Sequence, residues 1–133
     1  MCLVRQTKTK TTEVIGYQLV RKVIGGYRAL FDVLDSEPVY RKNVRSKAQE
    51  IYNRQRQPQG KPGFHVMHSL ASARKLLRDN RVTFTKYACI VEVKGEQVYA
   101  KGTSELRSAR TGCFEKYGTT YLAAYRTIIQ EVK

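Results

Sequence analysis

The chain has 133 residues, of which 25 are Lys or Arg and 11 are Asp or Glu, giving a formal net charge of +14 at pH 7. This length suits a single domain with one core, and a hydrophobic content of 41% indicates a folded chain rather than a disordered one. No run of about 18 apolar residues occurs, so no membrane-spanning helix and no membrane partner are expected. The positive field should attract polyanions such as nucleic acid, a phosphorylated small molecule or an acidic protein surface.

The first residues, "MCLVRQTKTKTTE", hold too few apolar side chains for the hydrophobic region of a signal peptide. We therefore expect the protein to act in the compartment where it is made, the cytoplasm. Cys2, Cys89 and Cys113 lie far apart and match no zinc-ligand spacing, so free thiols are expected, with neither a metal nor another cofactor. Cys89 is expected to be a small buried hydrophobic residue.

The first predicted elements form a hairpin after an N-terminal arm at 1–13. Residues 14–23, "VIGYQLVRKV", are β-branched and aromatic in alternation, which predicts a strand. "YRALFDVL" at 27–34 predicts a second strand. Gly25-Gly26 between them is typical of a hairpin turn, because both glycines tolerate a positive φ.

The following segment, residues 35–62, is strongly basic. Within it "SKAQEIYNRQ", residues 46–55, contains helix formers, and Val44, Ala48, Ile51 and Tyr52 share a helical face, so a short helix capped by Ser46 is expected. The residues after it are rich in proline and glycine, which predicts a loop over 53–63.

The second half begins with a strand at "GFHVM", residues 63–67, followed by a helix over 70–78 with Ser69 as its N-cap. "YACIVEVKGEQVYAKG", residues 87–102, predicts a hairpin that turns at Lys94-Gly95-Glu96. Residues 102–120 are polar, which predicts a loop. The last run, "YLAAYRTIIQEV", favours a closing strand, with a helix as the alternative.

These elements predict one α+β domain over residues 1–133. Its sheet is antiparallel with about five strands, one main helix packs on a face of the sheet, and a second short helix is possible.

His65 and His68, the only histidines, raise the question of a catalytic or metal site. Their spacing does not match the i, i+4 pair of a helical zinc site, and no third ligand is near, so metal binding is not expected. No GxSxG or phosphate-binding loop accompanies them, which favours a non-enzymatic protein without excluding an enzyme. The helix N-terminus beside Ser69 is a candidate anion site formed by His65, His68, Ser69 and Arg74. The alternative is that Ser69 satisfies the free N–H groups itself and the histidines are packing or surface residues.

Four stretches carry a resemblance to known proteins: "MCLVRQTK", "YQLVRKV" with "GGYRALF", "PGFHVMHSLASAR" and "CIVEVKG", in this order. Together they resemble small uncharacterised proteins of phages, large DNA viruses and some bacteria. The resemblance covers much of the chain and implies a viral or phage accessory protein, found in the host cytoplasm or the virion. It supplies no catalytic residues.

The order of strands and helix is also similar to the ADP-ribosyltransferase-like fold. That similarity places Tyr17 or Arg21, His65 or Ser69, and Glu131 at its functional positions. The STS and ExE signatures of that fold are absent here, so the similarity extends to topology rather than to transfer chemistry.

Three functions remain open. The first is a non-enzymatic polyanion binder, most simply for DNA or RNA, that uses phosphate contacts and stacks bases on Tyr40 and Tyr52. The second is a virion structural protein bound to a capsid partner or to another copy of itself. The third is a nucleotide-derivative binder or transferase. The basic residues expected to contact phosphate are Arg41, Lys42, Arg45, Lys47, Arg54, Arg56 and Lys61. Tyr17, Tyr87 and Tyr99 lie in predicted strands and are expected in the core or at its rim.

Overall fold

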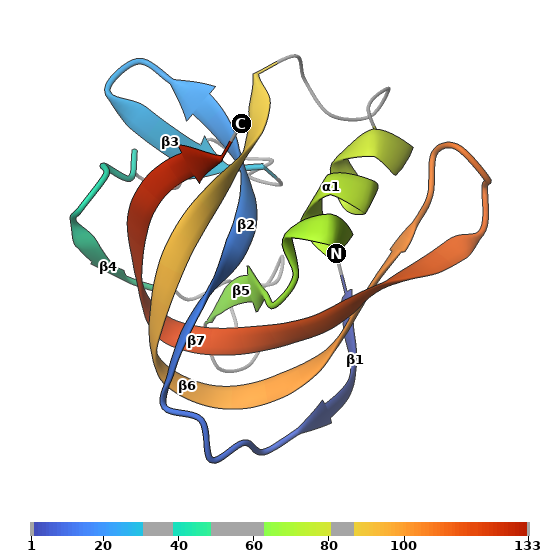
Figure 1. The fold of residues 1–133 in the computed structure, drawn as a ribbon, viewed down its shortest axis with the longest axis horizontal. Helices are drawn as coiled ribbons and strands as arrows, with labels where there is room; N and C mark the ends of the chain where they lie inside the picture. Colours follow the sequence, from blue (N-terminus) through green and yellow to red (C-terminus); the bar gives the residue numbers. More distant parts are fainter. Residues whose placement is uncertain (1, 31–38, 49–62, 81–86, 133) are drawn as a thin grey trace, which may run out of the picture.

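The computed structural model describes residues 2–30, 39–48, 63–80 and 87–132, which form one seven-stranded sheet and a helix (Figure 1). The sheet order is β1-β6-β2-β5-β7-β4, and β3 pairs with β2 outside this path. The strands are β1 (Cys2–Thr7), β2 (Glu13–Val23), β3 (Gly26–Ala29), β4 (Arg45–Lys47), β5 (Phe64–Met67), β6 (Ala88–Arg107) and β7 (Phe114–Val132). The helix is α1 (Leu70–Asp79).

The hairpin of β6 and β7 dominates the architecture. These strands have 20 and 19 residues and pair with each other from Ile90↔Val132 to Arg107↔Phe114. The hairpin bends strongly, and α1 lies inside its curve (Figure 1). Register shifts between Glu92 and Val93, Val98 and Ala100, and Thr103 and Glu105 supply the irregularities by which paired strands bend.

The sheet closes on itself through short β5. β2 pairs with β6 along Glu13–Arg21, β6 pairs with β7, β7 pairs with β5, and β5 returns to β2 at Tyr17↔Met67. Gly16 allows this closure, because a Cβ at that position would stand 2.4 Å from the carbonyl oxygen of Met67. Four strands therefore form a ring.

Two apolar cores follow from this closure. One lies within the ring and includes Val20, Val66, Val91 and Ala123, one residue from each of its four strands. The other lies under α1, where Ala73 and Leu76 of the helix pack with residues of the sheet: Leu19, Met67, Ile90 and Tyr117. Because successive residues of a strand face opposite sides of the sheet, Leu19 and Val20 enter different cores.

A buried arginine lies in the core within the ring. Arg126 is 2% exposed, and its guanidinium carbon lies 4.3 Å from the ring centroids of both Tyr40 and Phe64. Its Nη1 also donates a hydrogen bond to Oε1 of Gln18. Arg126 therefore connects β7, the segment before β4, β5 and β2.

The prediction of an α+β domain with about five strands is wrong, because the described residues form seven strands and only one helix, which makes the fold nearly all-β. The strand at 14–23, the hairpin that follows it, the strand at 63–67, the Ser69-capped helix and the closing strand are confirmed. The hairpin turns at Ile24-Gly25, one residue earlier than predicted, because Gly26 already pairs with Val23. The second short helix is wrong over 46–48, because Ser46 and Lys47 belong to β4 and Ala48 follows this strand without helical structure. The rest of that helix and the loop at 53–62 lie outside the described residues.

The hairpin turn at Lys94-Gly95-Glu96 is also wrong, because β6 continues through it. Gly95 is buried, and a Cβ there would lie 3.0 Å from Cβ of Ala123 and 3.2 Å from Cγ1 of Val14. Gly95 therefore allows neighbouring strands to pack closely and does not form a turn.

Two further segments differ from their predictions. The predicted loop at 102–120 is mostly strand, and the turn between β6 and β7 covers only residues 108–113. The N-terminal arm includes β1, which pairs with β6 at Leu3↔Ser104. Within the described part of the chain, no helix is long and apolar enough to cross a membrane.

Arg126→Lys should lower the free energy of unfolding by about 2 kcal/mol, because a compact ammonium cannot contact both rings and Gln18 at once. Arg126→Ala should cost more, about 2–5 kcal/mol, since it also leaves a cavity. Arg126→Met keeps most of the volume and serves as the control. Urea unfolding measures all three, and a lysine variant as stable as the wild type would contradict the role assigned to the guanidinium.

Candidate polyanion-binding surface

Basic side chains gather at the hairpin of β2 and β3. Arg21 and Arg28 stand directly opposite each other in the register, and Lys22 stands opposite Tyr27. Residues paired in this way share a face of the sheet with Cβ atoms about 5 Å apart. The hairpin therefore brings two guanidinium side chains together on one face and places an ammonium on the other.

The segment before β4 extends this basic region. Tyr27 and Tyr40 exchange backbone hydrogen bonds of 2.9 and 2.7 Å, so Arg41 and Lys42 follow directly from a segment attached to β3. Gly26 allows the contact, because a Cβ there would lie 2.2 Å from the carbonyl oxygen of Tyr40. The β2–β3 hairpin and β4 consequently lie on the same side of the molecule, at the left in Figure 1.

β4 adds two more cations. Arg45 packs its guanidinium carbon 3.9 Å from the ring centroid of Tyr125 and lies 3.5 Å from a carboxylate oxygen of Glu96. Lys47 is exposed, as are Arg41 and Lys42. Among the described residues, no carboxylate forms an ion pair with Arg41, Lys42 or Lys47. These three charges are therefore available to a partner, whereas Arg45 is partly engaged.

A groove of about 780 Å³ lies at the hairpin end of this surface. Tyr87 precedes β6 at the groove and is 57% exposed, and the backbone N–H of Lys22 donates to its carbonyl oxygen over 2.9 Å. The hairpin groove, as we call it, combines three basic residues with three aliphatic residues and one tyrosine; its lining is Arg21, Lys22, Val23, Ile24, Arg28, Val39 and Tyr87.

Lys22 also belongs to a small cluster around Glu131. Its Nζ lies 3.2 Å from Oε2 of Glu131, to which the hydroxyl of Tyr27 donates over 3.3 Å. The hydrogen bond with Glu131 raises the pKa of Lys22, and burial raises the pKa of Tyr27. Burial, followed by the charge of Glu131, raises the pKa of Cys89 to about 11, so this thiol is protonated and a poor nucleophile at neutral pH.

Of the residues suggested by the ADP-ribosyltransferase-like fold, Glu131 does not share a face of the sheet with Tyr17 or Arg21. Glu131 is in register with Val91, which is in register with Gln18. Glu131 therefore shares a face of the sheet with Gln18, while Tyr17 and Arg21 point to the opposite face.

The two histidines lie in β5 and directly after it, just before α1. His65 is partly buried in β5, and burial lowers its pKa, so its imidazole is neutral at pH 7 and contributes no charge to an anion site. His68 is exposed, and its ring makes an edge contact with Tyr121 at 6.1 Å between centroids. Oγ of Ser69 accepts a 3.3 Å hydrogen bond from the backbone N–H of Ser72. Ser69 thus satisfies one donor of the proposed anion site itself, and Arg74 is exposed on the helix beyond it.

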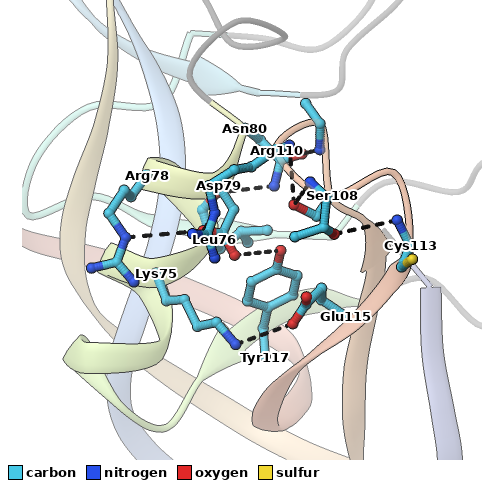
Figure 2. A network of polar contacts seen from close by, with 12 residues as sticks. Lys75, Leu76, Arg78, Asp79, Asn80, Ser108, Arg110, Cys113, Glu115 and Tyr117 are labelled. Atoms are coloured by element: carbon cyan, nitrogen blue, oxygen red, sulfur yellow. Dashed lines mark hydrogen bonds and ion pairs between the residues drawn. The ribbon is translucent and has the colours of Figure 1, made fainter.

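A second basic region lies where the end of α1 meets the turn between β6 and β7 (Figure 2). Asp79 is buried, with Oδ1 3.1 Å from Nε of Arg110 and 3.9 Å from Nε of Arg78. The hydroxyl of Tyr117 donates to its Oδ2 over 3.1 Å. Lys75 pairs with Glu115 at 3.2 Å. Acidic partners therefore accompany the cations here, and the network attaches the helix to the hairpin.

Some residues predicted from the sequence are not available at the surface. Tyr40 is 5% exposed and packs edge-on against Phe64, so it cannot stack on a base as predicted. Tyr87, expected in the core or at its rim, is instead the exposed aromatic residue of the hairpin groove. Four predicted contact residues lie outside the described residues: Tyr52, Arg54, Arg56 and Lys61.

Comparison with known proteins adds no relative: no family model, curated protein or solved structure matches the chain. Within the described ranges, His, Cys, Asp and Glu side chains form no group of three or more that could hold a metal ion.

Tyr117→Phe should lower the free energy of unfolding by about 1–3 kcal/mol at pH 8, because the buried Asp79 loses a hydrogen-bond donor. Burial, together with the bond to Asp79, raises the pKa of Tyr117 above its ordinary value of 10.0. The phenol therefore stabilises the fold fully below pH 10, and this stabilisation is lost as the pH rises through the higher folded-state pKa. Urea unfolding from pH 8 to 11 should show that the difference in free energy of unfolding between wild type and variant becomes smaller above pH 10. A constant difference would contradict this assignment.

Proposed function

We propose that this protein is a non-enzymatic nucleic-acid-binding protein that holds its ligand mainly through phosphate contacts. The observation that carries the proposal is the joining of two basic sets, distant in sequence, on one side of the molecule. Arg21 and Arg28 come from the first hairpin, and the attached segment supplies Arg41, Lys42 and Lys47. Five cations on one side of the molecule suit a ligand with many phosphates.

The distribution of acids favours this side over the end of α1. Around α1, buried Asp79 lies against two arginines and Glu115 pairs with Lys75. Near β4, Arg41, Lys42 and Lys47 are exposed and have no ion pair within the described part of the chain. A polyanion at this surface gains attraction without having to displace an acidic side chain from these residues.

The same region offers little support for covalent chemistry. The Cys89 thiol has a pKa of about 11, and Glu131 is engaged by Lys22 and Tyr27. Neither group is arranged as an activated nucleophile with a nearby base. Binding without catalysis is therefore the simplest function for this surface.

The test removes the three available charges together, as Arg41→Gln, Lys42→Gln and Lys47→Gln. Fluorescence anisotropy of a labelled mixed-sequence oligonucleotide across a salt series should give a steep fall of log affinity with log salt for the wild type. Each phosphate contact contributes about 0.7 to this slope on a single strand, so the triple variant should lose about 2 units of slope and bind more weakly at low salt.

A matched control removes three exposed lysines away from this surface, as Lys8→Gln, Lys10→Gln and Lys101→Gln. This control variant has the same net charge as the first variant, so its affinity for the oligonucleotide should fall slightly. The slope of log affinity against log salt should stay close to that of the wild type. Equal losses in both variants would show that total charge alone drives binding. Absence of binding by the wild type at low salt would refute the proposed function.

A further inference from the structure

The hairpin groove differs from the rest of the basic surface because it has apolar and aromatic lining. Val23, Ile24 and Val39 line it with Tyr87, and Ile24 at the turn of the hairpin is fully exposed. Phosphate contacts alone require no such side chains. Exposed apolar side chains in a concave region mark a surface that a ligand covers.

Tyr87 is held in place at this groove. The backbone hydrogen bond from Lys22 to its carbonyl oxygen fixes the residue beside β2 just before β6 begins. Its side chain is nevertheless 57% exposed, so a large part of it is open to a ligand. A positioned, exposed tyrosine among basic residues provides the kind of platform on which a nucleic-acid base stacks.

The basic residues of the groove complete this arrangement. Arg21 and Arg28 stand opposite each other on adjacent strands, and Lys22 lies next to Arg21 on the chain. Two positive charges that share one face of adjacent strands create a local field that attracts a phosphate. Backbone phosphates can therefore lie along the arginines while a base contacts the tyrosine.

We propose that the hairpin groove binds single-stranded nucleic acid, with an unstacked base on Tyr87 and the adjoining phosphates on Arg21 and Arg28. This inference depends on the proposed function and specifies the form of the ligand. A duplex keeps its bases stacked inside and presents phosphates outward, so it would use the cations and leave the aromatic and aliphatic lining uncovered. A single strand uses both.

Two ligands of equal length separate base contacts from phosphate contacts. One is a labelled oligothymidylate, and the other is an abasic strand with the same number of phosphates. At moderate salt, the wild type should bind the thymidylate at least tenfold more tightly than the abasic strand and more tightly than a duplex of the same length.

Tyr87→Ala should weaken thymidylate binding by about fivefold to a hundredfold, the loss expected for one stacked base, and leave abasic binding unchanged. Tyr87→Phe keeps the ring and should bind like the wild type. Circular dichroism of both variants checks the fold, which an exposed residue should not disturb.

The inference is overturned if the abasic strand binds as tightly as the thymidylate, or if Tyr87→Ala binds both strands as the wild type does. It is also overturned if the groove is occupied by a second copy of the chain, seen as a dimer that Tyr87→Ala dissociates, or if an acidic peptide of the same length and charge binds as tightly as the thymidylate. The proposed function fails separately, if neither strand nor duplex binds at low salt.

Discussion

The contact of Arg126 with Tyr40, Phe64 and Gln18 is the interaction on which the rest of the structure depends. Burying the cation of Arg126 is costly, and contacts with the rings of Tyr40 and Phe64 and the amide oxygen of Gln18 offset that cost. These contacts form only when the four segments of the chain that carry the four residues are held together. One of these segments carries Tyr40, which also bonds to Tyr27 in β3. An interior arginine thus fixes the segment from which Arg41 and Lys42 project, so the core positions the basic surface.

Local patterns predicted much of the fold. The alternation of β2, the hairpin turn after it and the serine cap of α1 are each determined by residues close in sequence. Gly95 shows where such prediction fails. Its role is set by Val14, Val66 and Ala123, which are distant in sequence and reach it only after the strands have paired. The same limit explains why the polar residues 102–120 were expected to be a loop. They form strands because the end of β6 pairs with the start of β7 and with β1, and these pairings are not visible in the local sequence.

The candidate surface was predicted in part. Net charge indicated a polyanion partner, and Arg41, Lys42 and Lys47 are exposed as a phosphate contact requires. Tyr40 could not be distinguished from a surface aromatic residue, because its burial depends on Arg126 from the far end of the chain. The opposition of Arg21 and Arg28 was missed, because the predicted turn at Gly25-Gly26 would have paired Arg21 with Leu30 instead. A hairpin that turns at Ile24-Gly25 pairs Val23 with Gly26, and counting back two residues on each strand brings the arginines together.

The most direct test is a titration of the isotope-labelled protein with a short single-stranded oligonucleotide, followed by amide chemical shifts in NMR spectra. The account predicts that the largest changes fall on residues 21–28, 39–47 and 87, with little change in α1 or around Asp79. Changes centred on α1 and the turn at 108–113, or spread evenly over all basic residues, would contradict it.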